Sequence, residues 1–464
     1  MTSTFSTLST ALSALQYNSA ALAVAGGNIA NVSTAGYARR TINAESVAQS
    51  GMPAMWSRSV SNGDGVKVGS VQRMVDPLLD AQARRQHASQ AYLDVQQSSL
   101  QRVETGFNEP GASGVAAAIA DFRTSWHDLA NNPGSDAARS EVLGKAATLA
   151  SAIGTQAANI TTESGDQRTR ILNDVSEVNS VATELASTNK AINAASLNGS
   201  DTGTLLDTRD QLALRLSELT GATATTRADG EFDVTLNGVS LVDGASAGTL
   251  QIASGITSTG ASDGNVISYA ITDSSRTTAV PAGMTGEIGG VTDLLTTTLP
   301  AYSSGLDAVA QQLADEINTQ HEAGYDANGN AGTAFFSYDP TDPAATLAVA
   351  ITSTSALAAS GIPGGGLDAA NATAMAGSTT VEASYQQLIN GFGTHVDAVN
   401  RATTSQQTLT TQVDTSRTAL SGVSTDEELT SMLTSQRSYQ AASRVMTTVD
   451  SMLDTLINHT GLVA

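Results

Sequence analysis

The sequence predicts a mainly α-helical fold: a discontinuous rod, or coiled-coil bundle, built from both ends of the chain, with a small inserted β domain. Three observations lead to this prediction. Apolar residues recur every seven positions near each terminus. Aromatic residues are only 4% of the chain although 40% of it is hydrophobic, so aliphatic side chains dominate, which suits thin helices. Residues 222–285 change to a period of two, which is typical of strands.

Residues 1–40 are predicted to form a helix followed by a turn. No charged side chain precedes Arg39, so the flanks of this helix carry no acidic or basic residue. An isolated coiled coil uses such charges to select its partner, and their absence indicates burial among several neighbours. An ordinary buried helix of one domain is the alternative interpretation of the same pattern. The predicted seam consists of Leu8, Leu12, Leu15, Leu22 and Ile29.

Residues 378–464 are predicted to be C-terminal helices that pair with the N-terminal region. Ser424 and Glu427 have the spacing of a capping box, which marks the start of the last helix. Two terminal helices of the same heptad type indicate that the chain ends lie together. The apolar columns of the last helix contain Met432, Tyr439, Met446, Val449, Leu453 and Leu456.

The middle of the chain is predicted to contain four parts between these ends. Residues 41–221 form the N-terminal half of a helical rod, and residues 222–285 form the β domain. Within that domain Asn237-Gly238 separates two alternating runs, which predicts a hairpin. Residues 286–324 return as helix, and residues 325–377, rich in Gly, Ala and Pro, form an irregular or β excursion.

Composition excludes several classes of function. The chain has 464 residues with 22 Lys+Arg against 44 Asp+Glu, and its net charge of −22 opposes binding to nucleic acid or an anionic membrane. There is no Cys, which excludes disulfides, thiolate nucleophiles and Cys-ligated metals. Neither a conventional signal peptide nor a membrane-spanning run is apparent, so we expect a soluble chain.

Residues 26–40 carry the most specific motif in the chain. Asn31 to Gly36 has the pattern of a helix stop followed by a turn, with Gly36 free to take positive φ. The run resembles the signature of axial proteins of the bacterial flagellum. The matching positions are Asn28, Ile29, Ala30, Asn31, Thr34, Gly36 and Tyr37.

Further blocks resemble the flagellar hook-associated protein 1 family across nearly the whole chain. They include Gly63–Val66, Leu205–Asp210 and Tyr439–Val445. The resemblance implies a structural component of the flagellum, not an enzyme, that forms the junction ring between hook and filament. Another axial protein, a hook or filament subunit, is the alternative. The heptad residues of both ends, with Asn28, Asn31, Gly36 and Tyr37, would form the assembly interface.

The resemblance also implies partners and a location. The expected partners are further copies of this chain, the hook protein, the second junction protein on the filament side, and an export chaperone that binds the C-terminal helices. The expected location is the extracellular flagellum, reached through the flagellar type III apparatus without a cleaved signal peptide. Neither nucleic acid nor a membrane is an expected partner. An adhesin role for the exposed middle domain stays open.

Candidate chemistry is sparse, and we expect no catalytic residue, cofactor or metal. Ser246 lies in a Gly-x-Ser-x-Gly pattern, but in a hairpin-rich segment rather than a strand–turn–helix. Asp326 begins a calcium-like run that lacks the closing Glu, and we interpret it as a turn. His321 lacks the second His of a zinc protease motif. Asp207 and Asp210 flank Arg209 and are expected to form a salt-bridged helix face.

Overall fold

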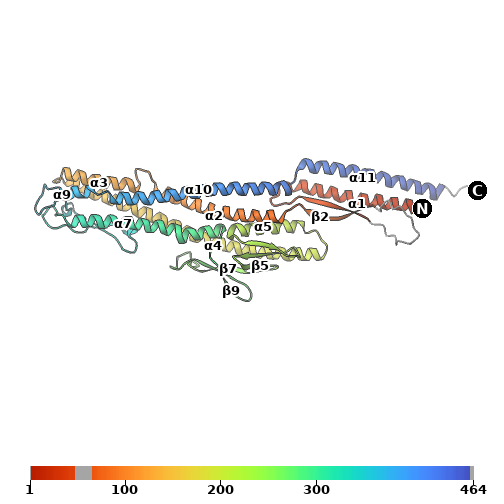
Figure 1. The fold of residues 1–464 in the computed structure, drawn as a ribbon, viewed down its shortest axis with the longest axis horizontal. Coiled ribbons are helices and arrows are strands. Elements are labelled where there is room, and N and C mark those ends of the chain that lie inside the picture. Colours follow the sequence, from red (N-terminus) through yellow and green to blue (C-terminus); the bar gives the residue numbers. More distant parts are fainter. Residues whose placement is uncertain (1, 48–64, 460–464) are drawn as a thin grey trace, which may run out of the picture.

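The computed structural model describes residues 2–47 and 65–459, and the first two residues of the predicted Gly63–Val66 block lie outside them. The chain forms a long rod in which both termini lie at the same end (Figure 1). The helices are α1 (Thr2–Ala30), α2 (Pro77–Phe107), α3 (Val115–Asn131), α4 (Asp136–Leu197), α5 (Gly203–Thr220), α6 (Gly286–Asp293), α7 (Leu299–Glu322), α8 (Pro343–Thr346), α9 (Ala370–Gly377), α10 (Thr380–Ser421) and α11 (Thr425–Asp454). The mainly α prediction is confirmed.

The strands form four small antiparallel sheets. A two-stranded ribbon follows α1, a four-stranded and a three-stranded sheet lie side by side in the β domain, and a two-residue pair lies in the excursion. The strands are β1 (Arg40–Ser46), β2 (Val66–Arg73), β3 (Thr223–Thr226), β4 (Phe232–Leu236), β5 (Val239–Asp243), β6 (Ser246–Ala247), β7 (Thr249–Ser254), β8 (Ser268–Thr272), β9 (Thr277–Val280), β10 (Phe336–Ser337) and β11 (Ala348–Val349).

Local sequence explains where the long helices α2 and α4 begin. Asp76 accepts hydrogen bonds from the Leu78 and Leu79 amides at the start of α2, and Pro77 occupies the first helical position. Ser135 caps α4 in the same way, accepting from Ala138 N–H at 3.2 Å. Each of these helices therefore starts where a side chain replaces a missing backbone partner.

The central helix α4 supplies one wall of the core along most of the rod. Its buried column includes Ile171, Val178 and Leu185, all fully buried. The core cluster extends from Val95 to Val399 and, among the described residues, includes none from α1 or α11. The middle of the chain therefore has a closed core of its own, and the terminal helices do not contribute to it.

The β domain contains the predicted hairpin. β4 pairs with β5, and Asn237 (φ 47°) and Gly238 (φ 85°) form the turn between them. Positive φ at both turn residues is what a two-residue hairpin requires, which explains the Asn-Gly pair. β8 begins at Ser268, and Val266, two residues earlier, lies outside the strand and is 77% exposed.

Two asparagines attach both sheets to α4. The fully buried Asn189 amide donates to the carbonyls of Phe232 (2.9 Å) and Gly244 (2.7 Å) and accepts from Phe232 N–H (3.1 Å). Asn179 exchanges two hydrogen bonds with the backbone of Leu250. These amides satisfy strand groups that have no partner within the sheet.

Residues 325–377 contain more regular structure than the sequence predicts. α8, α9 and the β10–β11 pair lie in this segment, and β1 after the N-terminal turn was also not expected. α9 is eight residues of mostly small side chains, which carry little periodic signal. His321 holds the segment to α7: its Nδ1 donates to the Thr333 carbonyl, and its Nε2 accepts from Ala358 N–H at 2.9 Å.

We predict that Asn189→Ala lowers the free energy of unfolding by about 2–4 kcal/mol, because it leaves several buried backbone groups without partners. Denaturant unfolding followed by circular dichroism measures the change. Asn173→Ala is the control, since Asn173 is exposed on the same helix. Equal effects of the two substitutions would contradict the attachment described above.

Candidate assembly interface

α1 and α11 form an antiparallel pair that extends beyond the rest of the rod (Figure 1). On α1 the buried residues Ala11, Asn18 and Ala25 recur every seven positions. On α11 the buried residues are Glu428 and Val449. The buried positions of α1 are mostly small residues, and the β1–β2 ribbon also contacts α1. The pair is therefore a narrow stalk with a ribbon along α1 rather than a closed helical bundle.

The predicted heptad residues lie along this contact, but many remain accessible. Half-buried positions are Leu8, Leu15, Leu22, Ile29, Met432, Met446 and Leu453. Leu12 of the predicted seam lies away from the contact: it is 45% exposed, and the preceding residue, Ala11, is buried instead. Tyr439 on α11 and Leu456, in the helical turn Thr455–His459 that follows α11, are also exposed.

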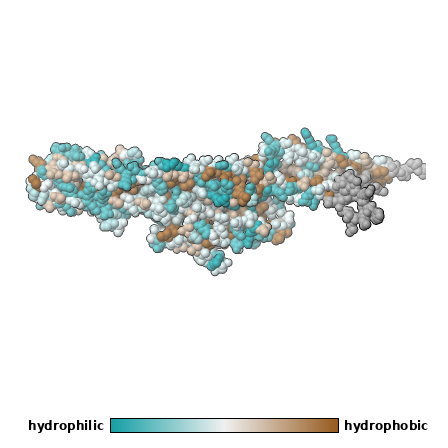
Figure 2. Space-filling view, in the orientation of Figure 1, coloured by the Kyte–Doolittle hydropathy of each residue, from teal (hydrophilic) through white to brown (hydrophobic). Residues whose placement is uncertain are grey.

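The stalk therefore leaves an apolar surface that two helices cannot cover. Its exposed large apolar residues, 39% or more accessible, include Leu12, Leu429, Leu433, Tyr439, Val445, Met452, Leu456 and Ile457. Brown atoms are visible on this end of the rod in Figure 2. Scattered exposed apolar residues are normal, but a concentration of them on one element marks an interaction surface.

Asn28 organises a polar joint where the stalk meets the rod. It is fully buried, and its amide donates to Arg40 O (2.9 Å) and Glu428 Oε2 (3.0 Å). Its oxygen accepts from Tyr37 Oη (2.9 Å) and Arg40 N–H (3.0 Å). All four hydrogen-bonding positions of the amide are thus used, which explains why asparagine stands there.

The turn after α1 uses the remaining motif residues. Asn31 Nδ2 donates to the Gly27 carbonyl (2.9 Å), which ends the helix, and its oxygen accepts from Thr34 Oγ1. Gly36 has φ +74°, and Gln211 of α5 occupies the space that a Cβ would need. The Gln211 amide donates to the Ala35 carbonyl. A larger residue at position 36 would be strained by the positive φ and would displace the Gln211 side chain.

Ion pairs connect the joint to the helices on both sides. Arg39 contacts Glu428 (2.7 Å) and Glu427 (2.9 Å) at the start of α11, and Arg40 contacts Asp201 (3.1 Å) and Asp207 (3.5 Å). Burial raises the pKa of the Tyr37 hydroxyl, which favours its neutral, hydrogen-bond-donating form. We define the polar joint as Asn28, Tyr37, Arg39, Arg40 and Glu428.

The salt-bridged face predicted on α5 forms the rod side of this joint. Arg73 of β2 contacts Asp207 (2.8 Å) and Asp210 (2.7 Å). Arg209 contacts Asp210 and lies over the Phe232 ring, 3.7 Å from its centroid. Burial raises the pKa of Asp207 although Arg73 opposes the shift. These charged side chains are paired with one another and hold α5 to β2 and β4.

Four residues of the joint region, Arg39, Arg40, Arg73 and Glu428, were not predicted as functional. Glu428 is separated from Asn28 by 400 positions, so no sequence spacing links them. The sequence contains only a weak indication that Arg39 and Arg40 take part: they are the first charged residues of the chain and directly follow the motif. A buried carboxylate needs a cation, and these were the candidates nearest the turn.

His87 of α2 links α5 and α10 through two carboxylates. Its Nδ1 lies 3.3 Å from Glu218 Oε1 of α5, and its Nε2 lies 3.0 Å from Asp414 Oδ2 of α10. Carboxylates accept hydrogen bonds, so both ring nitrogens must carry a proton. The Glu218 and Asp414 hydrogen bonds raise the pKa of His87 against the opposing effect of burial.

The remaining chemical candidates have structural explanations. Ser246 lies exposed in the short strand β6. Asp326 accepts backbone N–H groups from Asn328 and Asn330, both at 2.8 Å, as in a turn. Burial lowers the pKa of His321, consistent with its neutral role. Among the described residues, no cluster of three or more metal-ligating side chains occurs.

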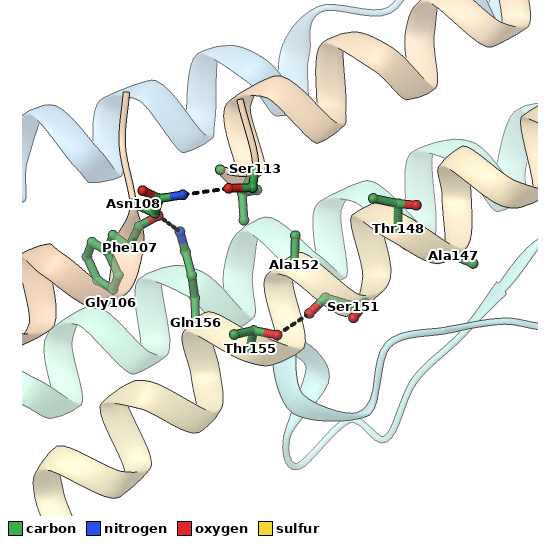
Figure 3. Close-up of a pocket in the computed structure, with 12 residues that line it drawn as sticks. Gly106, Phe107, Asn108, Ser113, Ala147, Thr148, Ser151, Ala152, Thr155 and Gln156 are labelled. Carbon is green, nitrogen blue, oxygen red and sulfur yellow. Dashed lines mark hydrogen bonds between the residues drawn. The ribbon is translucent and has the colours of Figure 1, made fainter. Parts of the chain in front are cut away.

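The groove of Figure 3 lies where α2 ends and α3 packs against α4. It has a volume of about 640 Å³. Gln156 donates to the Phe107 carbonyl, and Asn108 donates to Ser113 Oγ (2.6 Å) at its rim. Its lining contains small, aromatic and amide side chains and no acidic, basic or imidazole group. General acid–base chemistry has no group to use there.

We predict that Glu428→Ala destabilises α1 by about 2–3 kcal/mol, because Asn28 and Arg39 lose their buried acceptor. Hydrogen exchange of the α1 backbone amides measures this local effect. Glu427→Ala is the control, since the Glu427 side chain is 63% exposed and its ion pair contributes little. If both variants exchanged alike, Glu428 would not be the organising acceptor.

We predict that the stabilisation provided by His87 depends on pH. Its folded pKa lies above the unfolded value of about 6.5, so the contribution is complete below that value and fades as pH rises through the folded pKa. Denaturant unfolding of the original chain and of His87→Ala at pH 5.5 and pH 9 should give the larger difference at pH 5.5. A larger difference at pH 9 would contradict the imidazolium assignment.

Comparison with protein families matches three segments of the chain. Residues 100–336 match the flagellar hook-associated protein FlgK helical domain. Residues 8–37, which cover most of α1 and its turn, match the flagella basal body rod protein family. Residues 416–459, which contain α11, match the flagellar basal body rod FlgEFG protein C-terminal family. The joint thus lies where these segments meet.

Whole-chain relatives agree with these matches. Flagellar hook-associated protein 1 of Bacillus subtilis is 30% identical over all of this chain and 99% of its own. That of Escherichia coli is 29% identical over 71% of this chain and 60% of its own. The fold resembles the flagellar hook junction protein FlgK from Burkholderia pseudomallei, with TM-score 0.63 and 16% identity over 75% of this chain and all of that one. The chain belongs to the flagellar hook-associated protein 1 family.

Proposed function

We propose that the chain acts as a structural subunit of the bacterial flagellum, forming the junction ring between hook and filament. The observation that carries this proposal is the stalk of α1 and α11, which is separate from the core of the rod and exposes apolar residues that need neighbours. Family membership supports the same conclusion. Catalysis plays no part in this function.

The mechanism is assembly through the stalk. Side-by-side stalks from a ring of subunits would bury the exposed apolar residues in a shared tube, while the polar joint sets the angle between stalk and rod. Residues 1–40 and 378–464 would therefore assemble, and the β domain of residues 222–285 would project outward. The uncharged N-terminal helix suits a position inside such a tube, since a buried unpaired charge is costly.

A ring between hook and filament would have partners on both of its sides. We propose the hook protein on one side of the ring, and the second junction protein and the filament on the other. We further propose export through the flagellar type III apparatus, with a chaperone covering the apolar side of α11 until assembly. The exposed Leu433 and Met452 are groups that such a chaperone would cover. Among the described residues, no helix could cross a membrane.

A hook or filament subunit is the alternative, because the terminal segments match rod protein families in general. Copy number distinguishes the two, since a ring needs few subunits and a filament very many. The decisive experiment is electron microscopy of flagella from a strain that lacks the chain. Hooks without filaments support the junction function, and normal filaments would overturn it.

We predict that Leu453→Asp abolishes filament attachment, because it places a charge in the half-buried α1–α11 contact. The fraction of hooks bearing filaments in micrographs measures the effect. Ser451→Asp is the control, since Ser451 lies two residues earlier on the exposed side of the same helix. Filaments present at normal frequency on Leu453→Asp cells would contradict the stalk assignment.

A further inference from the structure

Asp174 is a buried carboxylate of the rod that is incompletely paired. It lies on α4, where that helix contacts α6, and its side chain is only 9% exposed. Its Oδ2 is buried without a hydrogen-bond partner among the described residues, and Arg170 Nε lies 4.0 Å from it. That guanidinium is already engaged, since Arg170 Nε donates to Glu287 Oε1 of α6 at 2.9 Å. A buried charge with so little compensation is costly.

The groups around Asp174 carry more negative than positive charge. We define the carboxylate cluster as Arg170, Asp174, Glu177, Arg215, Glu218 and Glu287, which come from α4, α5 and α6. Four carboxylates in this cluster share two guanidiniums. Arg215 lies 2.6 Å from Glu177 and 3.9 Å from Glu287, so it is divided among several acceptors.

Two further titratable groups face the carboxylate cluster, from β8 and from α2. Tyr269 of β8 is 5% exposed, and its Oη lies 2.7 Å from Thr292 Oγ1 of α6. Burial raises the pKa of Tyr269 to about 12, so its hydroxyl is neutral at ordinary pH. His87 of α2 lies beside Glu218 and, as an imidazolium, offsets one carboxylate. Within the described part of the chain, at least one negative charge of the cluster remains unbalanced.

Protonation of Asp174 removes this imbalance. Burial is the main cause that raises the pKa of Asp174 from 3.8 to about 7, and the charge of Glu287 adds to the shift while Arg170 opposes it. The folded chain therefore keeps a proton between about pH 4 and pH 7 that a locally opened chain has lost. By linkage, the contact around Asp174 is most stable below about pH 4 and loses stability as pH rises to about 7, where the loss is complete.

The position of Asp174 determines what this loss would loosen. α6 follows directly after the β domain of residues 222–285, and the Tyr269–Thr292 hydrogen bond joins it to β8. We propose that Asp174 makes the contact of α4 with α6 and β8 a pH-sensitive latch, which is tight when the carboxyl group is protonated and opens more readily when it is ionised. The latch belongs to the isolated chain and does not depend on the proposed junction function.

Hydrogen exchange of the purified chain and of Asp174→Asn tests the latch. Asparagine has the shape of the protonated carboxyl group but cannot ionise. Comparing the two proteins at the same pH cancels the pH dependence of the intrinsic exchange rate. We expect the ratio of exchange rates in α6 and β8, original over variant, to rise roughly tenfold or more from pH 5 to pH 8.

Asp166→Asn is the matched control, since Asp166 is exposed on the same helix. Its ratio of exchange rates should be the same at both pH values. A ratio for Asp174→Asn that is equal at pH 5 and pH 8 would overturn the proposal, because a purely structural role of the side chain changes exchange alike at both.

A second variant tests whether the carboxylate cluster is the cause. Glu287→Gln removes a neighbouring negative charge and releases Arg170 to pair with Asp174. In the Glu287→Gln background, Asp174→Asn should therefore change the ratio between pH 5 and pH 8 by less than about threefold. A pH dependence as large as in the original background would show that the excess charge does not control Asp174, and would overturn the latch as described.

Discussion

The structure depends on a hydrogen bond between two residues separated by 400 positions, Asn28 and Glu428. Glu428 is 4% exposed, and a carboxylate at such a site is tolerated only when cations and donors surround it. Asn28 and Arg39 provide them, and both come from the N-terminal segment. These contacts join the end of α1 to the start of α11, where the stalk begins. Arg40, which follows in the same segment, contacts Asp207 and so holds the stalk next to α5.

The contrast between rod and stalk explains how one chain serves two purposes. The rod buries Trp126, Leu149 and Leu216 completely in a continuous core. The stalk buries few residues and keeps large apolar side chains accessible. Because burial of apolar surface is the main stabilising contribution to folding, the rod has the larger share of it, and the proposed assembly would supply the burial that the stalk lacks.

Sequence periodicity predicted most of this architecture, because heptads and alternating strands leave strong signals. The helices, the paired ends and the Asn237-Gly238 hairpin follow from such patterns. Periodicity did not reveal that Ala11, Asn18 and Ala25 are buried on α1 while the leucines stay accessible, since the larger leucines dominate the apolar pattern. The acceptor Glu428 could not be linked to Asn28 either, because its contact depends on tertiary closure.

The central claim is that the stalk is completed by other subunits in the flagellum. Maleimide labelling of Leu12→Cys, the only thiol in that variant, measures this directly in the purified chain and in isolated flagella. Leu367→Cys, at a site 78% exposed in the rod, serves as the reference. We expect Leu12→Cys to react in the purified chain and to become protected in flagella, while Leu367→Cys reacts in both. Equal reactivity of Leu12→Cys in the two samples would contradict it.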